Sequence, residues 1–137
     1  MLENWLSTKQ GQVFHYKMEK IEYALELLGN PQFAVPVIHV AGTNGKGSTI
    51  AFLRQLFQVH GLRVGSFVSP HMVSVHDRIC IDSQPISDHD FQRYLQKVHD
   101  LEQEVATRYE PFRYFEVMVL IMFLYFEAQQ PDVALVE

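Results

Sequence analysis

A chain of 137 residues in which 47% are hydrophobic is long enough to form one globular domain around a substantial core, so a disordered protein is excluded. The formal net charge is only -5, and Lys and Arg form no cluster, which argues against nucleic acid as a partner. A single cysteine excludes an internal disulfide, and with no signal peptide and no apolar run of membrane-spanning length we expect a cytoplasmic protein without membrane contact.

The first half of the chain predicts a helix, a strand and a second helix. The first helix ends at the turn formed by residues 29–31 and has apolar residues at helical spacing, namely Met18, Ile21, Leu25 and Leu28. Residues 36–41 form a β-branched run that predicts a short buried strand. Glycines and polar residues follow. Residues 49–59 then predict a helix with one apolar side, made of Ile50, Leu53, Leu56 and Phe57.

The middle of the chain predicts a second strand and a third helix. Residues 64–68 read as the strand, which ends at Ser69, and a loop of mixed character then extends to Pro85. Acidic residues just before an apolar stripe suit the N-terminus of a helix, and this helix continues from Ser87 to about residue 105.

Two apolar segments follow and decide the predicted fold class. Residues 113–128 predict a helix that is apolar on nearly every side, and residues 133–137 predict a third buried strand. Strands that alternate with helices predict an α/β fold, here a P-loop-type three-layer domain with a mostly parallel sheet. Because nothing follows the last core strand to cover the sheet, we expect this domain to be incomplete at its C-terminus.

A glycine-rich segment, HVAGTNGKGST over residues 39–49, lies where the first strand passes into a helix. Glycines allow the backbone to approach a polyphosphate closely, and the helix N-terminus adds partial positive charge. Lys46 supplies a full charge for the outer phosphates, and Ser48 or Thr49 offers a hydroxyl near Mg²⁺. The alternative is a glycine turn with an incidental lysine, but the flanking strand and helix favour binding of ATP with Mg²⁺ by Gly42, Thr43, Asn44, Gly45, Lys46, Gly47, Ser48 and Thr49.

This segment resembles the phosphate loop of the folylpolyglutamate/dihydrofolate synthases, within the Mur-ligase-like superfamily. Gly47 favours the folate branch, because Mur ligases usually carry a hydroxyl residue directly after the lysine. Further segments resemble the family in order and spacing: LLGNP at 27–31, Ser69-Pro70-His71, Asp77-Arg78-Ile79, Tyr114-Phe115-Glu116 and the strand ending at Glu137. Asp77 departs from the pattern, since the family usually has glutamate there.

The resemblance implies an ATP-dependent ligase that adds L-glutamate to a folate through an acyl-phosphate intermediate. The acceptor would be tetrahydrofolate, dihydropteroate or both, and the full-length enzyme would be a monomer. Lys46 would be catalytic, and Ser48, Ser69 and Glu137 would hold Mg²⁺. A carboxylate at the carboxyl end of a strand is also a natural oxygen ligand for this ion. His71 and Arg78 are candidate substrate contacts.

By the same resemblance, residues 1–137 would form the N-terminal part of the ATP-binding domain, without the C-terminal glutamate-ligase domain. We therefore expect this segment to be inactive alone. Three other interpretations stay open: a Mur-type ligase of cell-wall precursors, a non-catalytic nucleotide-binding module, and a P-loop NTPase that couples hydrolysis to movement.

Three further residues have structural interpretations. Glu116 lies within an apolar helix, so its charge needs a partner, and we expect it to serve as a structural hydrogen-bonding residue. His39 lies in a strand and is interpreted as a packing histidine rather than a ligand. Cys80 has no sequence context that predicts reactivity, and the histidine spacing shows no zinc signature.

Overall fold

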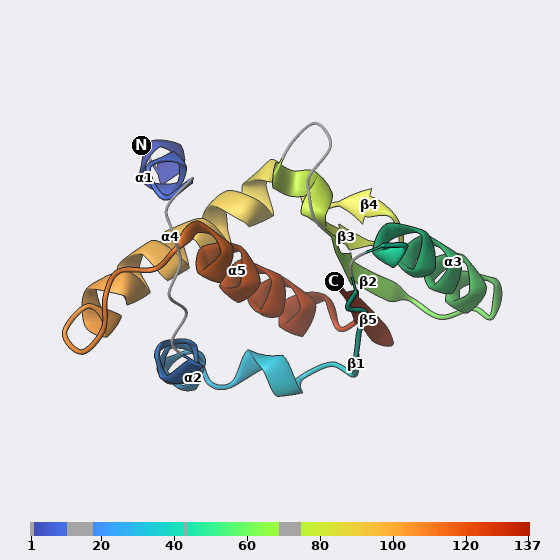
Figure 1. Ribbon diagram of the computed structural model, residues 1–137, viewed down its shortest axis with the longest axis horizontal. Helices are drawn as coiled ribbons and strands as arrows, with labels where there is room; N and C mark the ends of the chain where they lie inside the picture. The colour runs from blue at the N-terminus through green and yellow to red at the C-terminus, as the bar shows by residue number, and fades with distance from the viewer. Residues whose placement is uncertain (1, 11–17, 43, 69–74) are drawn as a thin grey trace. The chain divides into compact units, whose positions relative to one another are not determined.

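The structure is a computed structural model that describes residues 2–10, 18–42, 44–68 and 75–137 (Figure 1). The chain divides into two compact units. One unit is Met1–Gln32 with His89–Tyr125, and the other is Phe33–Asp88 with Phe126–Glu137. The glycine-rich loop belongs to the second unit.

A five-stranded sheet in the order β1-β5-β2-β3-β4 forms the centre of this second unit (Figure 1). The strands β1 (Val37–His39), β5 (Val133–Val136) and β2 (Val64–Phe67) run parallel, with β5 between the other two. The strands β3 (Ile79–Ile81) and β4 (Gln84–Pro85) extend the sheet in antiparallel pairing. The predicted α/β fold, with parallel central strands, is confirmed.

The three parallel strands differ in burial. All of β2 and the first three residues of β5 are buried, as expected for apolar strands covered on both faces. In contrast, β1 is exposed along its length, and the residues Val37 and Ile38 are 42% and 39% exposed to solvent. The prediction of a buried strand at residues 36–41 is therefore wrong. The cause is position, since among the described residues β1 has β5 as its single partner strand and forms the sheet edge.

Helix α3 (Lys46–Val59) packs on the sheet through one apolar stripe. Ile50 is fully buried, and Leu53 and Phe57 pack beside it on a core formed with Val64, Val133 and Leu135. The predicted inclusion of Leu56 in this stripe is wrong, because Leu56 is 42% exposed. The spacing explains this, since residues 50, 53 and 57 point one way and position 56 falls at the margin of that face.

A β-hairpin occupies part of the segment that the sequence predicts as a loop. The two turn residues between β3 and β4, Asp82 and Ser83, have φ angles of 48° and 68°. Positive φ at both positions is typical of a type I′ turn, which usually needs Asn-Gly or a similar pair. Here Asp82 is held by Val64: its carboxylate accepts the Val64 N–H at 2.8 Å, and its own N–H donates to the Val64 carbonyl at 2.8 Å.

The other unit is built from helices. Helices α2 (Met18–Leu27), α4 (Asp88–Val105) and α5 (Tyr114–Gln129) confirm the prediction to within a few residues at each end. Helix α1 (Leu2–Ser7) is not predicted by the sequence pattern. Among the described residues, short 3₁₀ helices lie at Pro31–Phe33 (η1) and Val75–Arg78 (η2). No helix in the described ranges is long and apolar enough to cross a membrane.

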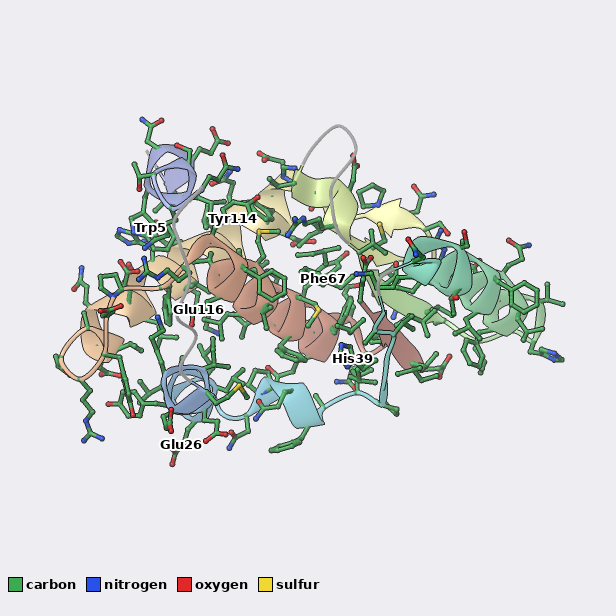
Figure 2. All side chains as sticks on the ribbon, viewed as in Figure 1. Trp5, Glu26, His39, Phe67, Tyr114 and Glu116 are labelled. Carbon is green, nitrogen blue, oxygen red and sulfur yellow. The ribbon has the colours of Figure 1, made fainter. Side chains whose placement is uncertain are left out.

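Two buried lysines fix the segment that joins α4 to α5. Lys9 Nζ lies 2.7 Å from Glu102 and also donates to the Phe112 carbonyl at 2.8 Å. Glu102 accepts two further hydrogen bonds, from the Phe112 N–H at 2.8 Å and from the Trp5 indole at 3.2 Å. This carboxylate therefore ties α1, α4 and the connecting segment together, and Figure 2 labels Trp5 on α1.

Glu116 forms the second buried pair, with Lys20 at 2.8 Å. The side chains of Lys20 and Glu116 are 4% and 2% exposed. Glu116 also accepts the Arg113 N–H at 2.8 Å at the start of α5, and Lys20 donates to the Pro111 carbonyl at 3.2 Å. The predicted structural role of Glu116 is confirmed.

Lys20→Met should destabilise the protein strongly, because it leaves the Glu116 carboxylate buried without its cation. Breaking a buried ion pair from one side costs about 3–5 kcal/mol. The double variant Lys20→Met/Glu116→Leu removes both charges and should recover most of this loss. Urea unfolding measures both effects, and a loss of less than about 1 kcal/mol in the single variant would contradict the assignment.

Gly65 in β2 is required by close packing rather than by its backbone angles. A Cβ atom at this position would lie 2.9 Å from the ring of Phe126, which is itself 2% exposed. Gly65→Ala should therefore cost about 1–3 kcal/mol in urea unfolding, the usual range for an overpacked core. In Phe126→Leu the same substitution should cost clearly less. Equal costs in the two backgrounds would show that this contact is not the cause.

Candidate functional site

The glycine-rich loop joins the end of β1 to the start of α3. The Val40 N–H donates to the Val136 carbonyl at 2.7 Å, which extends the β1–β5 pairing by one residue. Gly42 and Gly45 then take φ angles of 145° and 78°, which L-residues adopt rarely. Gly45 is the N-cap of α3, so the chain turns sharply and Lys46 becomes the first helical residue. The helix thus begins three residues earlier than predicted.

The surface of this loop is open. A Cβ atom added at Gly42, Gly45 or Gly47 would meet no atom within 4 Å. Gly47 lies inside α3 without a positive φ, so neither packing nor backbone conformation requires glycine at this position. Alanine would be the better helix former there. A glycine that the fold does not need, at the first turn of a helix, fits the close approach of a ligand to the backbone.

The first turn of α3 is suited to an anion. Helical N–H groups in the first turn have no acceptor within the helix, and Gly45 has no side chain to cap them. The helix dipole adds partial positive charge at the same point. Lys46 and the exposed Ser48 lie in this turn, and the Thr49 N–H already donates to the Gly45 carbonyl at 2.9 Å.

The carboxylate of Glu137 lies close to the ammonium group of Lys46. Lys46 Nζ lies 3.6 Å from Glu137 Oε1, and the two side chains are 34% and 9% exposed. The Glu137 N–H donates to the Phe67 carbonyl at 3.0 Å, so this residue continues the pairing of β5 with β2. The loop and this carboxylate thus lie together at the carboxyl ends of the parallel strands, the edge at which open α/β sheets bind ligands. Phe67 is labelled in Figure 2.

Arg78 lies at the same edge of the sheet. Its carbonyl accepts the Val68 N–H at 3.0 Å, where β2 has just ended. The side chain of Arg78 is half-buried. Three other candidates, Thr43, Ser69 and His71, fall outside the described residues, so their predicted roles stay predictions.

Two residues without a predicted role in the site, His39 and Cys80, differ in burial. His39 is exposed on β1, in register with Val136, so its interpretation as a packing histidine is wrong (Figure 2). Its exposure follows from the edge position of β1, which the sequence pattern does not reveal. Cys80 is buried in β3, and burial raises the pKa of its thiol above the ordinary value. A raised pKa keeps the thiol protonated and unreactive.

The donors at the loop fit a magnesium–nucleotide complex better than a dedicated metal centre. In the part of the chain that the structure describes, no three His, Cys, Asp or Glu side chains gather to hold a metal ion. Mg²⁺ in nucleotide sites commonly takes one or two protein oxygens and completes its shell with phosphate oxygens and water. The Glu137 carboxylate and the Ser48 hydroxyl provide oxygens of this kind.

Comparison with known proteins finds folylpolyglutamate and dihydrofolate synthases among the relatives of this chain. The chain is 37% identical over 108 residues to the dihydrofolate synthase/folylpolyglutamate synthase of Bacillus subtilis, covering 78% of the chain. It is 41% identical over 103 residues to a human mitochondrial folylpolyglutamate synthase, covering 74% of the chain. The folylpolyglutamate synthase of Mycobacterium tuberculosis, solved with ADP, superimposes with a TM-score of 0.90 at 31% identity over 99% of the chain. No family model matches the chain.

The chain is much shorter than these proteins. It spans 25% of the Bacillus subtilis relative and 18% of the human relative. It covers 31% of the Mycobacterium tuberculosis structure.

The two glycines at the start of α3 should respond oppositely to alanine. Gly45→Ala forces a side chain into a left-handed conformation and should lower the free energy of unfolding by roughly 1–2 kcal/mol. Gly47→Ala should leave stability unchanged or raise it by up to about 1 kcal/mol. Urea unfolding of both variants tests the assignment, and a destabilising Gly47→Ala would show that the fold itself requires this glycine.

Proposed function

Because the chain is a relative of the folylpolyglutamate/dihydrofolate synthases, we propose that it supplies the nucleotide-binding part of an ATP-dependent ligase that joins L-glutamate to a folate. The observation that carries this proposal is the open loop at the start of α3, with Lys46 facing Glu137. Residues 1–137 would be the N-terminal part of the ATP-binding domain. The glutamate-ligase domain would lie outside the segment, which agrees with its coverage of a quarter of the Bacillus subtilis relative.

The loop residues have distinct roles in this proposal. ATP binds at residues 42–49, where N–H groups at the start of α3 hold its phosphates, and Lys46 neutralises the charge that moves as the γ-phosphate transfers. Ser48 and Glu137 would hold Mg²⁺, with Ser69 as a third candidate. When bound, the ion draws charge from the phosphate oxygens. Arg78 and His71 remain candidate contacts for the folate.

The proposed reaction has two steps. A folate carboxylate attacks the γ-phosphorus of ATP, the bond to the β-phosphate oxygen breaks, and ADP leaves. The resulting acyl phosphate is then attacked by the amine of glutamate, an amide bond forms, and phosphate and a proton are released. Catalysis of this kind depends on positioning and on stabilisation of charge, so no protein nucleophile is needed.

Folate and glutamate enter the proposal as small-molecule substrates, with dihydropteroate as a second acceptor. The supporting observations are the names of the relatives and the absence of a cluster of basic residues from the sequence. We also propose a cytoplasmic location, supported by the single cysteine. The human relative is a mitochondrial protein.

The ligase proposal can be tested with a chimera. The 137-residue chain should release no ADP from Mg-ATP alone, because the proposed active enzyme needs the rest of the relatives' length. A chimera in which it replaces the matching segment of the Bacillus subtilis synthase should release ADP only when glutamate and either dihydropteroate or tetrahydrofolate are present. Lys46→Ala should lower this turnover at least about 100-fold, the size expected for a lost electrostatic contact in the transition state.

The controls separate the alternatives. Lys97→Ala removes a lysine from α4, away from the loop in the sequence, and should leave turnover unchanged. Turnover of the chimera without a pteroate would overturn the folate assignment. ADP release that needs no glutamate would instead point to an NTPase.

A further inference from the structure

We propose that Glu137 makes the phosphate loop selective for metal-bound nucleotides, because its carboxylate competes with phosphate for Lys46. The inference rests on the proposed function and adds a second role to the same carboxylate. Beyond holding the metal, Glu137 would exclude metal-free nucleotides and other free polyphosphates. The observation behind it is the 3.6 Å separation of Lys46 Nζ and Glu137 Oε1.

The backbone keeps this pair together. Glu137 is fixed to β2 by its N–H bond to Phe67, and the strand just before it is fixed to β1 through Val136 and Val40. Lys46 follows the left-handed turn at Gly45 and starts α3, whose stripe packs on the same strands. Both partners are therefore positioned by the sheet and its helix, and the contact does not depend on a flexible surface loop.

Partial burial strengthens the electrostatic attraction between Lys46 and Glu137. The Glu137 side chain is 9% exposed and the Lys46 side chain 34% exposed. Charges that are partly removed from water interact more strongly and are screened less by salt than exposed charges. A polyphosphate at the loop has to draw the Lys46 ammonium away from this carboxylate and then meets a negative charge beside its own.

A divalent cation reverses this effect. A cation bound near Glu137 would neutralise the carboxylate, and Lys46 would then be available to the phosphate oxygens. The same carboxylate then opposes a metal-free nucleotide and favours a metal-bound one. A carboxylate whose charge did not reach Lys46 and the phosphate position would leave binding of the metal-free nucleotide unchanged, which makes this the informative measurement.

Calorimetric titration of the chain with ADP, in EDTA and in excess Mg²⁺, tests the proposal with Glu137→Gln. This variant removes the charge but nearly keeps the shape of the side chain. We expect metal-free ADP to bind it about 10-fold more tightly than the wild type, and Mg-ADP about 10-fold more weakly, each a change of about 1.4 kcal/mol. Inorganic tripolyphosphate in EDTA should show the same gain, because the effect acts on phosphate.

Two further variants complete the test. Glu127→Gln removes one charge from the exposed end of α5, ahead of β5, and should change neither affinity. Glu137→Asp keeps the charge and should show no gain for metal-free ADP, which separates the charge from any loosening of the fold. Urea unfolding verifies that each variant is folded at the temperature of titration.

Each outcome decides between the possibilities. Weaker Mg-ADP binding with unchanged metal-free binding in Glu137→Gln would overturn the selectivity and leave a simple metal ligand. A gain of metal-free binding in Glu137→Asp as large as in Glu137→Gln would also overturn it. A wild-type chain that binds neither form of ADP would instead overturn the proposed nucleotide site, and the selectivity with it.

Discussion

The insertion of β5 between β1 and β2 is the constraint on which the site depends. The strand pairs in parallel with both neighbours, and its carboxyl end adds one hydrogen bond to each ladder. The Val136 carbonyl accepts the Val40 N–H on one side, and the Glu137 N–H donates to the Phe67 carbonyl on the other. These bonds place the start of the glycine-rich loop and the Glu137 carboxylate at one edge of the sheet. Without β5, β1 and β2 would not share a sheet, and Lys46 would have no carboxylate beside it.

The parts of the fold that the sequence predicts are those with a strong local pattern. The apolar spacing of α2, α4 and α5 and the apolar runs of β2 and β5 need no tertiary information. Other features depend on neighbours that the pattern does not show. The residues of β1 are as apolar as a core strand, yet an edge position leaves Val37 and Ile38 exposed. The turn at Asp82 lacks the usual glycine, because hydrogen bonds to Val64 stabilise it from another strand.

Part of the candidate site can likewise be predicted from local sequence, and part of it depends on tertiary structure. The glycine-rich loop is recognisable locally, since glycines and a lysine lie between a strand and a helix. The position of Glu137 at the carboxyl edge follows from the rule for parallel strands. Its direct contact with Lys46 is not predictable from the sequence, because it requires the strand order and the early start of α3. The positive φ of Gly45 sets that start, and spacing alone does not reveal it.

The strand order also has a consequence for the folding kinetics of this unit. Among the described strands β5 is the last along the chain, yet it lies between the other two parallel strands. Val37 therefore pairs with Ala134, a residue far from it in the sequence. Such pairings have high contact order, and their loop-closure entropy is lost before any ladder forms. Until β5 arrives, β1 and β2 present open strand edges, which are the surfaces most prone to aggregation. The long-range pairing of β5 with β1 therefore predicts slow folding of this unit.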